Sequence, residues 1–81
     1  MKVLVTIKKE IEITKKDIEE AVVYCQGRAR VIFMLDVLFR YLFNGEKLKD
    51  IAKKEGISTH SASKAKERAI EYVYNTVISK K

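Results

Sequence analysis

The side chains best suited to chemistry lie close together, between residues 58 and 68. His60 is the only histidine, which makes it the one candidate for general acid–base catalysis. No nucleophile or metal ligand accompanies it at a recognisable spacing, and the carboxylates of residues 10–20 form no metal-binding set. The chain also has no glycine-rich phosphate loop. The sequence therefore predicts that the protein is not an enzyme and uses neither a cofactor nor a metal.

The same segment is rich in hydrogen-bond donors and positive charge, and Ser58 is a favourable residue to begin a helix. The free N–H groups and the dipole of such a helix start favour a phosphate oxygen. Hydroxyl, imidazole and ammonium groups in the first turns have the length to reach base edges in a DNA major groove. Lysines at the start of the preceding helix would bind backbone phosphates. The predicted DNA contacts are Lys47, Lys49, Ser58, Thr59, His60, Ser61, Ser63, Lys64, Glu67 and Arg68.

The residues before this segment meet the needs of a sharp turn between two helices. Such a turn requires a small residue where the backbones approach, a residue that tolerates positive φ, and apolar residues on both sides. Ala52 and Gly56 meet the first two needs, and Ile51 and Ile57 bracket the turn. Inward-facing alanines at 62 and 65 then complete the pattern.

From Val31 to about Val77 the chain resembles the helix-turn-helix of sigma-factor region four and of LuxR-type response regulators. The resemblance rests on YLFNGEKLKDIAKKEGIS and on KERAIEYV further along. It implies a recognition helix in the major groove of double-stranded DNA. A looser resemblance links the strand and this motif to small DNA-binding regulators of archaeal plasmids and viruses.

The sequence departs from the family pattern at two places. Glu55 stands where the pattern usually has leucine, and Ala62 and Ala65 stand where larger aliphatic residues are common. We therefore expect Phe33 or Phe39 to supply the missing bulk. Nothing resembles the other sigma regions or a receiver domain.

Periodicity predicts a mainly α fold, with a short N-terminal β-strand followed by four helices and a helix-turn-helix in the C-terminal half. Residues 2–7 alternate as a strand does, and alternation resumes at Ile11 and Ile13, which allows one strand or two with an unpaired bend at residues 8–10. Helices are expected from Thr14 to about Gly27, over 28–43, over 46–54 and from Ser58 to about Ile78. Asp36 and Arg40, four residues apart, should form an ion pair.

The whole chain, 1–81, is predicted to be a single domain. Residues 28–43 are apolar almost all round, which is more than so small a domain can cover. We expect a homodimer, with residues 1–27 serving oligomerisation and 28–81 forming the DNA-binding unit. A lone strand edge that pairs with its copy in the second subunit would fit this arrangement.

Charge and composition agree with a polyanionic partner. The net charge is +6, and residues 44–81 hold nine basic against five acidic side chains. One cysteine, no secretory leader and no span long enough for a membrane predict a cytoplasmic protein without membrane contact. The abundance of Lys, Glu and Ile is typical of thermophiles and also of A·T-rich genomes.

The sequence thus predicts a sequence-specific, double-stranded DNA-binding transcription regulator. Two alternatives remain open. The first is an adaptor that docks on RNA polymerase through the helix at 28–43. The second is a packaging protein that binds DNA without sequence preference.

Overall fold

A computed structural model describes residues 2–6 and 9–79, and it is mainly helical with a small β element at the N-terminus. This confirms the predicted fold class. The elements in chain order are β1 (Lys2–Thr6), β2 (Lys9–Glu12), α1 (Lys15–Tyr24), α2 (Ala29–Phe43), α3 (Leu48–Glu55), α4 (Thr59–Val73) and η1, a π-helical turn (Tyr74–Ile78).

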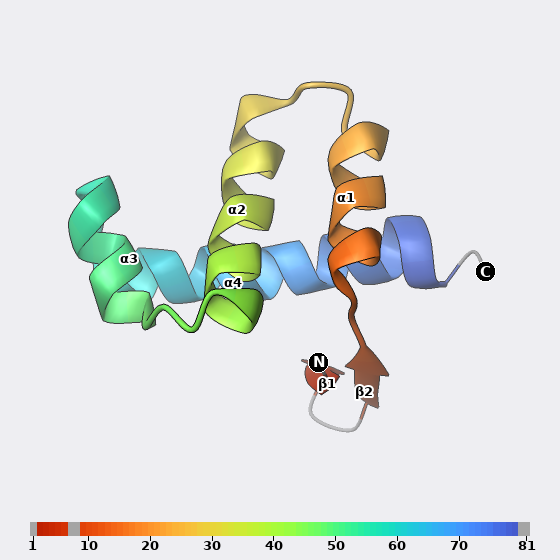
Figure 1. The fold of residues 1–81 in the computed structure, drawn as a ribbon, viewed down its shortest axis with the longest axis horizontal. Coiled ribbons are helices and arrows are strands. Elements are labelled where there is room, and N and C mark those ends of the chain that lie inside the picture. Colours follow the sequence, from red (N-terminus) through yellow and green to blue (C-terminus); the bar gives the residue numbers. More distant parts are fainter. Residues whose placement is uncertain (1, 7–8, 80–81) are drawn as a thin grey trace.

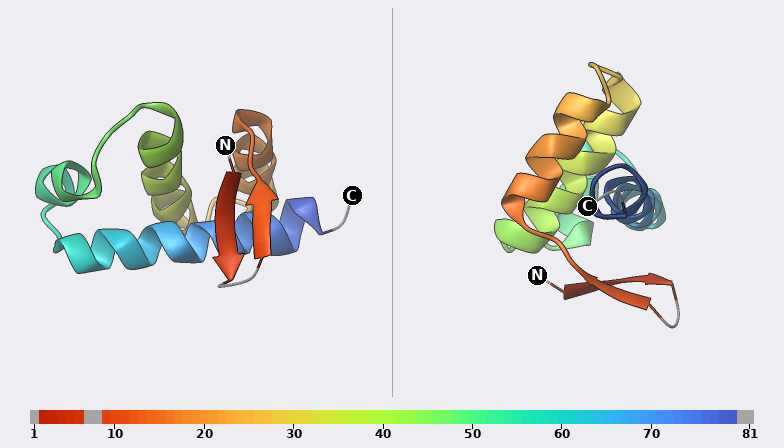
Figure 2. Two further views of the ribbon diagram at one scale, coloured as in Figure 1. Left: turned by 90° about the horizontal axis from the view of Figure 1, so that it is seen from below. Right: turned by 90° about the vertical axis from the view of Figure 1, so that its right-hand side faces the viewer.

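The long helix formed by α4 and η1 is the base on which the other elements lie (Figure 1). The antiparallel pair α1 and α2 crosses one side of it, and α3 packs at its N-terminal end. The strands cross its C-terminal half, where β1 contacts α4 (Figure 2). Of the elements that the structure describes, none lies on the other side of the N-terminal half of α4 (Figure 2).

The β element is an antiparallel pair within one chain. Lys2 faces Glu12 and Val3 faces Ile11 across the ladder, with a register shift between Leu4 and Thr6. The expected bend at residues 8–10 is wrong for Lys9 and Glu10, which pair with Thr6 and Leu4. Residues 7 and 8 lie outside the described part of the chain. Because β1 pairs with β2, its edge needs no second subunit on that side.

Helix α1 begins where its local sequence predicts. The Thr14 hydroxyl accepts a hydrogen bond from the Asp17 N–H at 3.2 Å, and the Asp17 carboxylate accepts one from the Thr14 N–H at 2.9 Å. This reciprocal capping box satisfies two backbone donors that the helix start leaves free. The inward stripe is buried at Ile18, Ala21 and Cys25, whereas Val22 at its edge is 37% exposed.

Helix α2 lies between two apolar clusters. Its Leu35, Leu38 and Leu42 belong to the main core, and Val37 belongs to a smaller cluster with Ile51 and Ala65. Phe33 packs against the smaller cluster, at the elbow between α3 and α4, and so supplies the bulk that the alanines lack. Phe39 packs against the main core instead.

The main core draws on both halves of the sequence. Ile11, Ile13, Ile18 and Ala21 are buried in it together with α2 and with the C-terminal half of α4. Ile13 and Ala21 have no exposed surface. The strands and α1 are therefore part of the packing that fixes α4.

The last helix continues to Ile78 as expected, but its final turn is widened. The Ser79 N–H donates to the Tyr74 carbonyl five residues back, at 2.8 Å. Among the described residues, no helix is both long enough and apolar enough to cross a bilayer.

Candidate nucleic-acid interface

The turn between α3 and α4 is closed by backbone hydrogen bonds around Gly56. The Ile57 N–H donates to the Ala52 carbonyl at 2.9 Å, and the Gly56 N–H donates to the Lys53 carbonyl at 3.4 Å. This is a Schellman closure, which requires a residue with positive φ, and Gly56 has φ +70°. A side chain there would meet nothing within 4 Å, so the glycine serves backbone conformation and not space.

The start of α4 keeps hydrogen-bond donors open to solvent. The Ser58 hydroxyl oxygen accepts a hydrogen bond from the Ser61 N–H at 3.0 Å, which fixes the first turn. Within the described part of the chain, the N–H groups of Thr59 and His60 have no hydrogen-bond partner. These two donors and the helix dipole suit an anionic oxygen.

The predicted contact residues of α4 lie on its outer side. Ala62, Ala65 and Ala69 face inward, and Ser63 is half-buried. At 100° per residue, positions 59, 63 and 67 form one row and positions 60 and 64 form the next, away from the alanines. The exposed predicted residues of this helix and its cap are Ser58, Thr59, His60, Ser61, Lys64, Glu67 and Arg68.

The outer side of α4 carries one pair of opposite charges. Lys64 Nζ lies 3.9 Å from Glu67 Oε2, and both side chains are more than half exposed. An exposed contact of this length holds the two groups only weakly. The lysine can therefore exchange the carboxylate for another anion.

The two predicted phosphate contacts outside α4 are set apart from the others. Lys47 is the residue before α3 and Lys49 lies in its first turn, and both are exposed. A helix of eight residues is about 12 Å long, so these lysines begin about that distance from the turn. Neither lysine lines the cavity that lies between α2 and α4.

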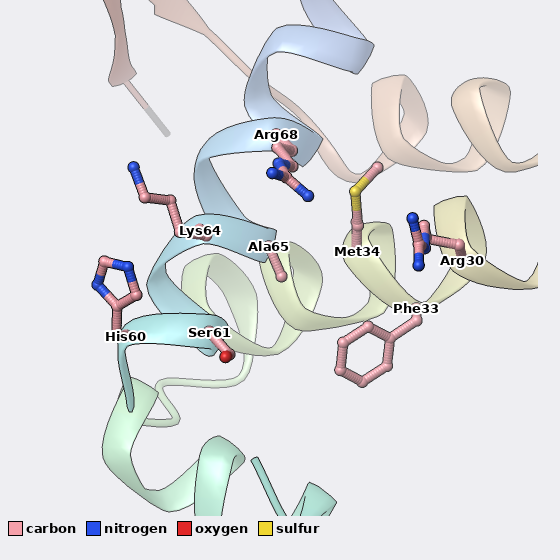
Figure 3. Close-up of a pocket in the computed structure, with 8 residues that line it drawn as sticks. All are labelled: Arg30, Phe33, Met34, His60, Ser61, Lys64, Ala65 and Arg68. Atoms are coloured by element: carbon pink, nitrogen blue, oxygen red, sulfur yellow. The ribbon is translucent and has the colours of Figure 1, made fainter. Parts of the chain in front are cut away.

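That pocket, a cavity of about 350 Å³, lies between α2 and α4 (Figure 3). It brings together four predicted residues that are separated by up to two turns of α4: His60, Ser61, Lys64 and Arg68. Ala65 also contributes from α4, and the opposite wall is formed by Arg30, Phe33 and Met34 of α2.

Arg30 was not predicted as a contact residue. Its position relative to α4 depends on how α2 crosses that helix, which local sequence does not specify. The sequence spacing could have indicated this position, because Phe33 and Met34 follow Arg30 by three and four residues and therefore share one side of a helix with it. Since Phe33 was expected near the turn between α3 and α4, Arg30 could have been predicted to lie close to the same turn.

The pocket is positively charged and contains no carboxylate in its lining. Within residues 2–6 and 9–79, neither Arg30 nor Arg68 forms an ion pair. Phe33, Met34 and Ala65 give it an apolar floor. Two guanidinium groups at one cavity suit an anionic ligand.

A second charge cluster holds α3 against α2. Arg40 pairs with Asp36 at 3.4 Å, as predicted, and also with Glu46 at 3.1 Å and Glu55 at 2.8 Å. The hydrogen bonds that Arg40 donates to Glu46 hold the pKa of that carboxyl below its ordinary range. The hydrogen bonds that Arg40 donates to Glu46 and Glu55 raise the pKa of the arginine itself. Glu55, the departure from the family pattern, thus serves as a surface ion-pair partner instead of an apolar contact.

An apolar groove of about 210 Å³ lies between α1 and α2. Val22 and Ile32 are more than a third exposed there, and Phe39 completes the α2 wall. Phe39 follows Arg30 by nine residues, or two and a half turns, so the two side chains lie on opposite sides of α2. The groove and the cationic pocket therefore face different directions.

The described residues contain no group of three or more His, Cys, Asp or Glu side chains placed to hold a metal ion. Comparison with known proteins found no match, whether with family models, with curated proteins or with solved structures.

Proposed function

We propose that this protein is a sequence-specific transcription regulator of the cytoplasm that binds double-stranded DNA with the N-terminal half of α4 in the major groove. The observation that carries the proposal is the combination at the start of α4. A closed turn and a serine cap present hydrogen-bonding side chains beside a cationic pocket that has no carboxylate in its lining. The helix-turn-helix resemblance of the sequence supports the same function.

The geometry of α4 suits this task. A major groove about 12 Å wide admits one α-helix, and among the described elements none covers the outer side of the N-terminal half of α4 (Figure 2). Thr59, His60, Ser63 and Lys64 would read base edges there. Ser58 and the open N–H groups behind it would hold a backbone phosphate, which fixes position without conveying sequence.

A homodimer is part of the proposal, with two reading helices about 34 Å apart on one face of the duplex. The apolar groove between α1 and α2 does not suit such a dimer. It opens on the side of α2 opposite the pocket, so a two-fold contact through it would turn the two α4 helices away from each other. We infer that a DNA-reading dimer would use a surface beside α4.

The test is selection of bound sequences from a random duplex pool at about 150 mM salt. The wild type is compared with Lys64→Ala and His60→Ala, and Lys53→Ala, exposed on α3, is the matched control. An enriched, partly palindromic site that the first two substitutions relax and the control retains supports the proposal.

Other results of the selection would point elsewhere. An unenriched pool with salt-sensitive binding indicates a packaging protein. Absence of binding indicates a protein partner such as RNA polymerase. Sedimentation at micromolar concentration checks the dimer, because a species of only 9.4 kDa would exclude it.

A further inference from the structure

We infer that the pocket between α2 and α4 binds one phosphate group, held between Arg30 and Arg68. The inference rests on the proposed function in one respect: the phosphate would belong to the DNA backbone. A free nucleotide offers the same chemistry, and the experiment below distinguishes the two sources.

The first argument is convergence of charge from two separate elements. Arg30 lies in the first turn of α2 and Arg68 in the middle of α4, yet both line one cavity, to which Lys64 and His60 also contribute (Figure 3). Positive side chains gathered at one cavity raise the local positive potential and attract an anion. In the described residues the chain supplies no carboxylate to this lining, although it places three carboxylates around Arg40.

The second argument is the match between the lining and a phosphate. A guanidinium group donates two parallel hydrogen bonds to phosphate oxygens, and two such groups satisfy several oxygens at once. Phe33, Met34 and Ala65 add apolar surface to the lining, and charged contacts beside apolar surface are stronger than in bulk water. A cavity of about 350 Å³ is many times the roughly 30 Å³ that one water occupies, so a hydrated phosphate fits.

The third argument is position relative to the reading surface. His60 and Lys64 line the pocket and also form the row of positions 60 and 64 on the outer side of α4. A duplex that receives α4 in its groove would therefore bring one strand against this rim. Arg30 would then tie α2 to that strand and fix the angle at which α4 enters, without reading sequence.

The first arm of the test measures the affinity of wild type, Arg30→Gln and Arg68→Gln for a duplex as a function of salt. Loss of one phosphate contact should lower the slope of log affinity against log salt by about 0.9 and weaken all duplex sequences alike. Arg28→Gln, exposed two residues earlier and absent from the lining, is the matched control and should retain the wild-type slope. Circular dichroism confirms that each variant is folded.

The second arm titrates the protein without DNA, using inorganic phosphate and deoxyadenosine monophosphate. The NMR signals of the arginine Nε–H groups report which side chains bind. Shifts of Arg30 and Arg68 that Arg30→Gln abolishes support the phosphate site. A nucleotide that binds while the DNA salt slopes of wild type and variants coincide supports the site and assigns it to a free nucleotide.

Two results separate the failure of this inference from the failure of the proposed function. If the wild type binds DNA, but Arg30→Gln keeps its slope and neither phosphate shifts the arginine signals, the phosphate site is overturned and DNA binding stands. If the wild type binds no duplex, the proposed function fails, and the titration alone decides whether the pocket takes a phosphate.

Discussion

The guanidinium group of Arg40 lies 2.8 Å from the Glu55 carboxylate and thereby joins the last turns of α2 to the last residue of α3. The same guanidinium reaches Asp36 and Glu46, so three carboxylates share one arginine whose side chain is only 15% exposed. This cluster sets α3 in place, and α3 in turn leads directly into the turn that starts α4.

Replacing Arg40 should destabilise the fold. Arg40→Met keeps most of the aliphatic packing but leaves three carboxylates near one another without their cation. We expect the free energy of unfolding to fall by about 1–2 kcal/mol, as for a partly buried ion-pair network. Urea denaturation measures it. Lys53→Met, an exposed change on α3, should stay within about 0.5 kcal/mol, and an equal loss in both variants would contradict the role of the cluster.

Glu46 should make stability depend on acid pH. Its folded pKa lies below its ordinary value of 4.5 because Arg40 donates hydrogen bonds to it. The unfolded chain therefore binds the proton first, and the stabilisation is present above pH 4.5 and is lost as pH falls through the folded pKa. Unfolding of wild type and Glu46→Gln from about pH 7 to about pH 3 should show a difference that narrows with acid. A difference that stays constant over this range would count against the assignment.

Gly56→Ala should cost about 1 kcal/mol of stability although the site has ample room. The cost arises from backbone conformation, since φ is +70° and, apart from the glycine and its two chain neighbours, no atom lies within 4 Å of the added carbon. Gly56→Asn tolerates this conformation better and should lose less. Thermal unfolding ranks the three proteins, and an alanine variant as stable as wild type would mean that the turn rearranges freely.

Two substitutions at Ser58 should distinguish its role in stability from its role in anion binding. Ser58→Ala removes the acceptor for the Ser61 N–H and should cost about 1 kcal/mol. Ser58→Asp keeps the cap and should keep the stability, but its negative charge opposes a phosphate at the helix start. We therefore expect the aspartate variant to bind DNA more weakly than the alanine variant, as fluorescence anisotropy can measure. The reverse order would argue against phosphate contact at this position.

The features that the sequence predicted well depend on local interactions. The caps at Thr14 and Ser58 are each decided within four residues, and the glycine turn at Gly56 is closed within the six residues from Ala52 to Ile57. The pairing of Asp36 with Arg40 follows from helix geometry alone.

The features that it missed depend on distant parts of the chain. The sequence between β1 and β2 contains no Asn-Gly or Asp-Gly pair, which would have indicated a tight turn, so a hairpin within one chain had little local support. Glu55 accepts a hydrogen bond from Arg40, fifteen residues away in the sequence, and Arg30 and Arg68 line one cavity although thirty-eight residues separate them. Such encounters follow from the angles at which helices cross, which side-chain packing fixes only when the whole chain has folded.

The shared main core has a consequence for protein engineering. Residues 28–81 contain the turn and the candidate DNA contacts, so they look like a module that could be fused to another protein. In the intact chain, however, Leu35 and Val73 are covered completely in a core that includes Ile13 and Ile18. A graft of the C-terminal part alone would carry an uncovered apolar strip along α2 and α4, and a successful transplant has to include the strands and α1.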